Sequence, residues 1–301
     1  MTNATAKPDP DPPSALQDVP AAPPNRAWRK FRNHIPGQIG ALLILLLVTT
    51  ALLAPVIAPY GFDVQELTRI NQPPSADHPF GTDRYGRDVL SRVIWGSQSV
   101  LKVAFVVVAI QLAIGTTLGM VAGYFGGWID TIISAVTDMV WAFPPLVLAL
   151  GIIAAIGPGL TNVIVAIAIT SWAPFARITR AKVMSLRSRD YVIAARAIGE
   201  TDPSILGRYI LPMIVGPNLV LATLTVPAAI LTTTALSFIG LGAQPPSPDW
   251  GAILNEGRQF LRNAWWISTF PGVAILLTAL AFNFLGDAMR DILDPQQSVI
   301  R

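Results

Sequence analysis

The sequence has no cysteine, only two histidines and few charged residues. Without cysteine there is no disulfide, no thiolate metal ligand and no cysteine nucleophile. His34 and His78 stand alone, outside any His-Glu-x-x-His pattern, which argues against a zinc protease and favours a structural role for each. A Gly-x-Ser-x-Gly motif is also absent. These absences disfavour a hydrolase, including one that works within a membrane.

A phosphate-binding loop is missing too. None of the four lysines lies in a Gly-x4-Gly-Lys-Ser/Thr context, so we expect the chain itself to bind no ATP, cofactor or metal. The net charge of +3 and the basic pI are better explained by orientation in a bilayer than by nucleic acid, and we expect no nucleic-acid partner.

Only 13% of the residues are charged and 52% are hydrophobic, with a mean hydropathy of +0.52. Soluble domains carry about twice that share of charge, so the sequence predicts an integral membrane protein surrounded by lipid. The first apolar run begins too late and is too long for a cleaved signal peptide. Six runs are long enough to be helical spans: about 39–58, 100–122, 132–156, 161–176, 214–241 and 267–285.

The distribution of lysine and arginine sets the orientation. With six spans and the N-terminus inside, fourteen of these residues fall on the inner side and six on the outer side, while Lys102 lies at the edge of a span. Because inner segments of membrane proteins are enriched in basic residues, both termini and the polar stretch 188–212 are predicted to be cytoplasmic.

This polar stretch predicts two short helices joined at a tight corner. Ser188 or Asp190 is expected to cap the first helix, and Gly199 to supply the left-handed residue that ends it. Pro203 suits the first turn of the second helix. Thr201 or Asp202 is expected to cap that helix, and Pro212 to end it. The predicted inward faces are Val192, Ala195 and Ile198 in the first helix, and Ile205, Leu206 and Tyr209 in the second.

Four further features fall within or beside the spans. A stripe of Gly115, Gly119, Gly123 and Gly127 predicts close approach of another helix. Asp138 is either a pathway residue or, as we favour, a carboxylate near the cytoplasmic interface. The pair Pro144-Pro145 predicts a kink. An interfacial helix is expected from Val89, and Trp265 and Trp266 are expected at a membrane boundary.

Several motifs, in order, resemble one family. Ala194-Ala195, three residues, Gly199 and then Ile210-Leu211-Pro212 is similar to the EAA loop of bacterial ABC importer permeases, although the usual Glu of that loop falls on Ile193. The segments Gly81-Thr-Asp-x-x-Gly-Arg-Asp88, Gly123-Tyr-Phe-Gly-Gly-Trp-Ile-Asp130 and Gly240-Leu-Gly-x-Gln-Pro-Pro-x-Pro-x-Trp-Gly251 resemble the dipeptide, oligopeptide and nickel class of these permeases. The chain looks like the second of the two permeases in such a system.

The resemblance implies the fold of a type I ABC importer permease: all-α, with six transmembrane helices, in the bacterial inner membrane. It further implies a homologous second permease, two ATP-binding subunits that hold ATP and Mg, and an extracytoplasmic substrate-binding protein. The expected organisation is a disordered proline-rich tail and basic flank (1–34), a first span with an outer loop and interfacial helix (35–99), a permease core (100–295) and a tail (296–301). The residues expected to couple to the ATPase are Asp190, Tyr191, Ala194, Ala195, Arg196, Gly199, Pro203, Arg208, Leu211 and Pro212.

Two alternatives remain at this point. Six spans and small-residue packing would also serve a channel or scaffold that works without ATP, and an intramembrane enzyme is disfavoured by the missing motifs. The substrate is left open among peptides, nickel complexes, glutathione and other small solutes.

Overall fold

The computed structural model describes residues 26–293, and within them it is helical, with one isolated bridge between Thr82 and Asp88. The expectation of a disordered tail falls on residues 1–25, outside the described residues. The helices are α1 Arg26–Arg32, α2 Ile35–Ile57, η1 Leu67–Arg69, α3 Val89–Phe125, α4 Gly127–Ala142, α5 Pro145–Ile156, α6 Leu160–Thr170, α7 Ala173–Leu186, α8 Asp190–Ala197, α9 Asp202–Ile205, the π turn η2 Leu206–Ile210, α10 Leu211–Phe238, α11 Trp250–Gly257, η3 Arg258–Phe260 and α12 Trp266–Leu293.

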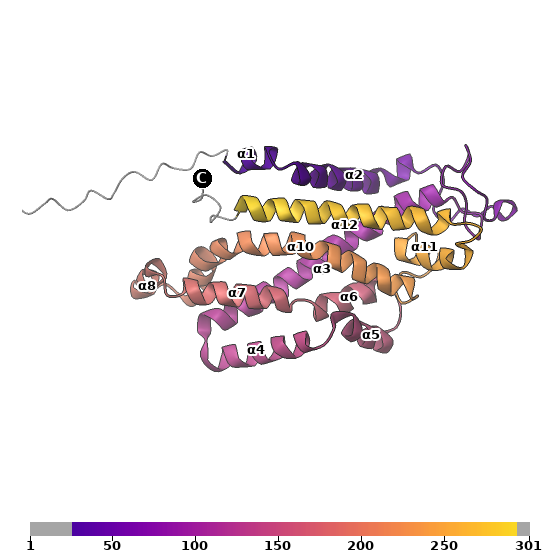
Figure 1. Ribbon diagram of the computed structural model, residues 1–301. Helices are drawn as coiled ribbons and strands as arrows, with labels where there is room; N and C mark the ends of the chain where they lie inside the picture. Colours follow the sequence, from indigo (N-terminus) through magenta and orange to yellow (C-terminus); the bar gives the residue numbers. More distant parts are fainter. Residues whose placement is uncertain (1–25, 294–301) are drawn as a thin grey trace, which may run out of the picture.

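The long helices form one elongated bundle (Figure 1). Five described segments are long and apolar enough to cross a membrane: 35–57, 89–125, 160–186, 202–238 and 266–292. The pair α4 and α5, bent by 90°, adds a sixth if it counts as one span. Helix α1, the hairpin of α8 and α9, and the described end of α12 lie at one end of the bundle, and α11 lies at the other. Because this arrangement requires an even number of crossings, six is the consistent number.

Helix α3 differs from the prediction at its start. It runs unbroken from Val89 through the span, about 55 Å at 1.5 Å per residue, and therefore crosses residue 100, where the permease core was expected to begin. Asp88 caps it by accepting a hydrogen bond from the Ser91 amide at 2.7 Å. Val89 and Arg92 are buried under the outer loop, so the interfacial helix expected here is instead the first part of α3.

The glycine stripe brings α3 against α7, as predicted. A Cβ on Gly115, Gly119 or Gly123 would lie 2.4–2.7 Å from backbone or side-chain atoms of α6–α7, so only glycine permits this contact. Gly127 is the exception, because a Cβ there would meet nothing within 4 Å. Its φ of +55° instead helps the chain turn from α3 into α4.

Prolines act in two ways in the bundle. At Pro144-Pro145 the chain breaks between α4 and α5, which confirms the predicted kink in a stronger form. Pro217 and Pro227, in contrast, lie inside the continuous helix α10.

Candidate functional site

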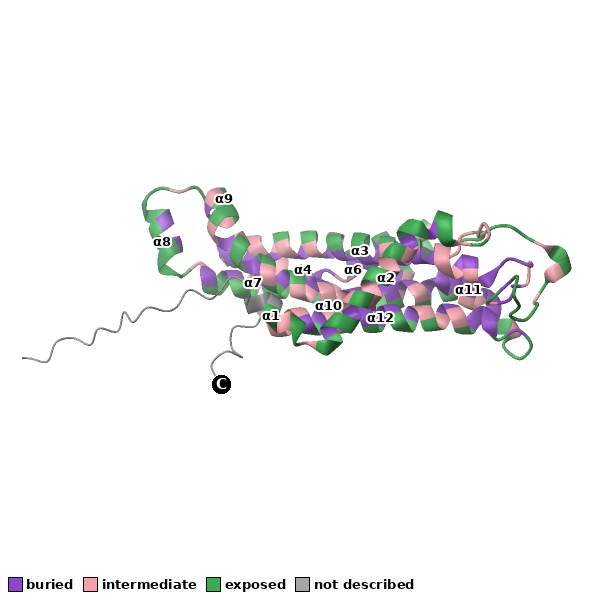
Figure 2. Ribbon diagram, turned by 90° about the horizontal axis from the view of Figure 1, so that it is seen from above, coloured by how far each residue is buried: buried purple, intermediate pink, exposed green. Residues whose placement is uncertain are grey.

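The predicted hairpin projects from the inner end of the bundle (Figure 2). Its foot is an apolar cluster in which Val192, Ala195, Ile205 and Ile210 are buried. Their partners belong to the ends of neighbouring helices: Tyr124 of α3, Val183 and Leu186 of α7, and Ile214 of α10. The hairpin is therefore packed onto the ends of three helices of the bundle.

The first helix of the hairpin, α8, ends as predicted but does not begin as predicted. Its N-cap is Arg189, without a side-chain cap, so the expected capping by Ser188 or Asp190 is wrong. The Ser188 hydroxyl donates to the Ser185 carbonyl instead, at 3.3 Å. At the other end Gly199 has φ +86°, as predicted, and two amides close the turn onto carbonyls of the last helical turn.

The second helix does not end where expected. Thr201 is the N-cap but makes no side-chain cap bond, and Pro203 lies in the first turn. Pro212 is the second residue of α10, so α9, η2 and α10 form one continuous helix and the predicted stop is wrong. The π turn explains how the helix continues past Pro212. Just before this proline, which has no N–H, the hydrogen bonding shifts by one residue, so that the Leu211 amide donates to the Leu206 carbonyl.

The face of the hairpin that points away from the bundle exposes apolar side chains. Ile198 is 79% exposed and Ile193 is 54% exposed, so the expectation that Ile198 faces inward is wrong. Tyr191 and Ala194 are exposed beside them, whereas Ala195 is buried. A contiguous exposed apolar surface outside the spans is typical of a contact site for another protein.

The other residues predicted for coupling lie on the polar side of the hairpin or at its corner. A Cβ on Gly199 would meet nothing within 4 Å, so this glycine serves the backbone turn and not a close helix crossing. Arg208 is exposed and lies 3.7 Å from a carboxylate oxygen of Glu200. Asp190 opens α8, and Leu211 with Pro212 opens α10.

Tyr124, at the end of α3, ties the hairpin to the bundle. Its hydroxyl donates to Asp202 at 2.6 Å, and the Arg196 guanidinium lies 5.4 Å from its ring. The hydrogen bond with Tyr124 raises the pKa of the Arg196 guanidinium above its ordinary value. Arg187 donates to the carbonyls of Gly123 and Tyr124 at 3.2 and 3.3 Å. Sequence reasoning missed this anchor because the contacts join residues about 60 to 80 positions apart.

At the outer end, four buried charges form one network. Asp83 pairs with Arg87 at 2.7 Å and with Arg92 at 2.6 Å. Both arginines also pair with Glu256 of α11. Asp83 and Arg87 are only four residues apart, whereas Glu256, which no local pattern in the sequence indicated, joins the loop and the start of α3 to α11.

Both histidines, and Trp266 at the start of α12, form hydrogen bonds within the chain. His78 is buried and lies 2.9 Å from Asp88, and His34 accepts from the Gly37 amide as the N-cap of α2. Trp265 is half exposed, whereas Trp266, at the start of α12, is buried and donates to the Thr82 carbonyl at 3.1 Å. Within residues 26–293, no cluster of His, Asp and Glu could hold a metal ion.

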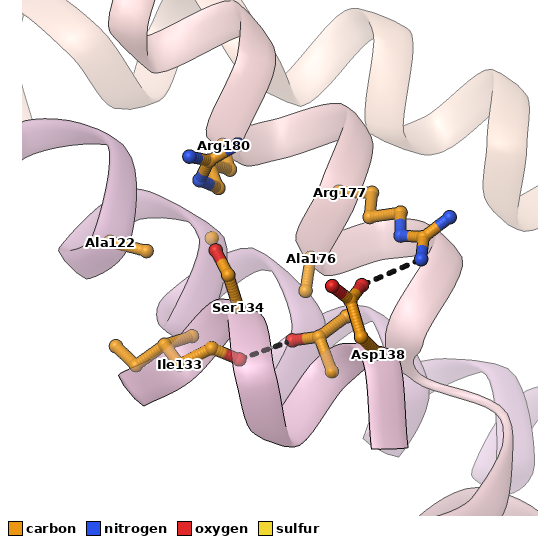
Figure 3. Close-up of a pocket in the computed structure, with 9 residues that line it drawn as sticks. Ala122, Ile133, Ser134, Asp138, Ala176, Arg177 and Arg180 are labelled. Carbon is orange, nitrogen blue, oxygen red and sulfur yellow. Dashed lines mark hydrogen bonds and ion pairs between the residues drawn. The ribbon is translucent and has the colours of Figure 1, made fainter. Parts of the chain in front are cut away.

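A cavity of about 420 Å³ lies between α3, α4 and α7 (Figure 3). Asp138 of α4 lies at its rim and pairs with Arg177 of α7 at 2.6 Å. The Arg177 guanidinium also lies 3.8 Å from the centre of the Trp141 ring. Asp138 is eleven residues beyond the start of α4, about 16 Å along its axis.

Comparison with known proteins agrees with this architecture. Residues 115–299 match the family described as binding-protein-dependent transport system inner membrane component, and residues 23–74 match the N-terminal TM domain of oligopeptide transport permease C. The dipeptide transport system permease protein DppC of Alkalihalophilus pseudofirmus is 41% identical over 96% of this chain and 95% of its own length. The glutathione transport system permease protein GsiD of Escherichia coli is 43% identical over 94% of this chain and 96% of its own.

A solved structure has the same fold. The inward-facing MetNI methionine ABC transporter superposes with a TM-score of 0.52 at 20% identity, over 67% of this chain and 96% of the compared chain. Its low identity limits this likeness to the fold, whereas the sequence relatives cover nearly the whole length. The chain therefore belongs to the family of binding-protein-dependent transport system inner membrane components, and it is a multi-pass ABC importer permease subunit of the bacterial inner membrane and not an enzyme.

Proposed function

We propose that this chain forms half of the translocation pathway of an ATP-driven importer for peptides or similar small solutes. A homologous second permease supplies the other half, and an extracytoplasmic binding protein delivers the solute. Two ATP-binding subunits, which hold ATP and Mg, dock on the hairpin 188–212. The relatives named for dipeptide and glutathione transport support this substrate class.

The observation that supports the coupling role is the combination of an exposed apolar tip and a packed foot. Ile193 and Ile198 offer apolar surface to a partner at the inner end of the bundle. Val192 and Ile205 hold the hairpin on the ends of α3 and α7. A force applied at the tip therefore reaches the transmembrane helices through packed side chains and through the continuous helix from Asp202 into α10. Ile193, which replaces the usual Glu, makes this contact apolar.

The test uses the complete importer, purified by a tag on this chain with its companion subunits. An aspartate in an apolar contact is desolvated without a partner, so Ile193→Asp and Ile198→Asp should each weaken retention of the ATPase subunits about tenfold or more. The matched control is Ile70→Asp, because Ile70 is 46% exposed but lies in the loop at the outer end.

Equal ATPase retention in all three variants would contradict docking at the hairpin. A channel or scaffold that works without ATP is the competing function. It predicts solute flux in vesicles that lack the ATPase subunits, whereas an importer permease predicts none. Neighbouring genes for a Walker-motif ATPase and a secreted binding protein would further favour the importer.

A further inference from the structure

The cavity between α3, α4 and α7 lies beside the contact that Gly119 makes between α3 and α7. Its lining also includes the small residues Ala122 of α3, Ser134 of α4 and Ala176 of α7. Its volume of about 420 Å³ lies within the range of pockets that hold small molecules. The remaining lining includes charged groups of both signs: Asp138, Arg177 and Arg180.

Both charges belong to candidate membrane spans: Asp138 to the bent pair of α4 and α5, and Arg177 to the segment Leu160–Leu186. The Asp138 side chain is 63% exposed in the isolated chain, and that of Arg177 is 48% exposed. Exposing an ion pair to hydrocarbon is costly, so charged groups within a span face protein or water-filled space. The rim of the cavity therefore opens toward the pathway or toward a neighbouring subunit.

Two ion pairs lie in this region, Asp130 with Arg180 and Asp138 with Arg177, and they differ in the number of hydrogen bonds that join the two side chains. Asp130 binds Arg180 through both carboxylate oxygens and also accepts from Ser134 at 3.2 Å, so this pair is saturated. Asp138 and Arg177 share a single contact, from Nη2 to Oδ1. Among the described residues, the second oxygen of Asp138 has no hydrogen-bond partner, and it is available to a ligand (Figure 3).

We propose that Asp138 and Arg177 form a binding site for a zwitterionic peptide, in which Asp138 binds the α-ammonium group and Arg177 binds the carboxylate. The pair is neutral overall and so is the ligand, so a bound zwitterion leaves neither protein charge unpaired. A molecule with only one of these groups leaves one protein charge unmatched. Stacking on Trp141 orients the guanidinium for this contact.

This inference rests on the proposed function, and binding to the assembled importer without its binding protein tests it. The probes are alanyl-alanine and trialanine, compared by calorimetry with N-acetyl-alanyl-alanine and alanyl-alanine amide. In the unmodified complex, each blocked peptide should bind about tenfold more weakly, because one charge-assisted contact is lost. Asp138→Asn should remove discrimination against the acetylated peptide, and Arg177→Gln should remove discrimination against the amide.

Matched variants separate recognition from packing. Asp138→Glu keeps the charge and should restore discrimination. Arg69→Gln, which removes an exposed arginine paired with Asp77 at the outer end, should change neither affinity. If the unmodified complex binds neither peptide, or binds blocked and free peptides equally, the zwitterion site is refuted.

The same preparation keeps the two hypotheses apart. ATPase subunits that fail to co-purify would refute the proposed function. An importer that retains its ATPase subunits and hydrolyses ATP, but whose peptide discrimination is unchanged by Asp138→Asn and Arg177→Gln, would refute only the zwitterion site.

Discussion

Gly199 gives the sharpest test of the hairpin as a coupling element. Its φ of +86° lies in the left-handed region, where an L-residue with a Cβ costs about 1–2 kcal/mol. A Cβ at this position would meet nothing within 4 Å, so this conformational term is the whole expected cost of Gly199→Ala. A change of this size shifts the population of the native corner by roughly 5- to 30-fold.

The assay is substrate-stimulated ATP hydrolysis by the assembled importer. A distorted corner changes the angle at which α8 meets the ATPase, so stimulation should fall while hydrolysis without substrate persists. The loss should grow from Gly199→Asn, since Asn tolerates the left-handed region best, through Gly199→Ala to Gly199→Val, since a β-branched residue tolerates it least.

Gly207→Ala provides the matched control. Gly207 lies in the same hairpin, and a Cβ there also meets nothing within 4 Å, but its φ is not positive. Alanine at this helical position should leave coupling unchanged and stabilise the helix slightly. Normal stimulation in Gly199→Val, equal to that of Gly207→Ala, would refute the reasoning.

Three further predictions concern stability, measured by thermal unfolding of the purified complex. Tyr124→Phe leaves Asp202 without its 2.6 Å hydrogen bond and should cost about 1–3 kcal/mol; an unchanged midpoint would contradict the anchor. Glu256→Gln breaks a buried charge network and should cost about 3–5 kcal/mol, whereas Glu66→Gln, in an exposed pair, should cost at most about 1 kcal/mol; similar losses would contradict the network's role. Burial raises the pKa of Asp249, the N-cap of α11, so ionising this carboxyl group opposes folding. The free energy of unfolding should therefore fall as the pH rises from the ordinary pKa of an aspartate through the raised pKa of Asp249. Asp249→Asn should remove that fall, and parallel pH profiles for the two proteins would refute it.

The general architecture was predictable because bilayers impose simple constraints. Apolar runs of about twenty residues predicted the spans, and the uneven distribution of lysine and arginine predicted the orientation that the family assignment supports. Gly199 and Pro144-Pro145 were read correctly since their backbone preferences are local. The motif spacing identified the family before any contact was known.

Local reasoning failed where a competing hydrogen bond, a change of helical turn or a distant segment decided the outcome. Ser188 had an alternative acceptor in the preceding turn, so it did not cap α8. Pro212 was accommodated by a π turn instead of ending the helix. Ile198 faces outward because α8 buries only one narrow face against the bundle. Trp266 found a buried carbonyl in the outer loop, which no neighbouring residue in the sequence indicated.

The sequence by itself determined the membrane class, the number and orientation of spans and the family, since these depend on composition, run length and local motifs. Only the tertiary structure decided which charges meet. Arg92 pairs with Asp83 nearby and with Glu256, which lies 164 positions away, and Asp138 and Arg177 come from separate helices beside a common cavity. Pairings of this kind depend on helix packing, in which the glycine stripe of α3 sets the distance to α7, and spacing along the chain does not encode them.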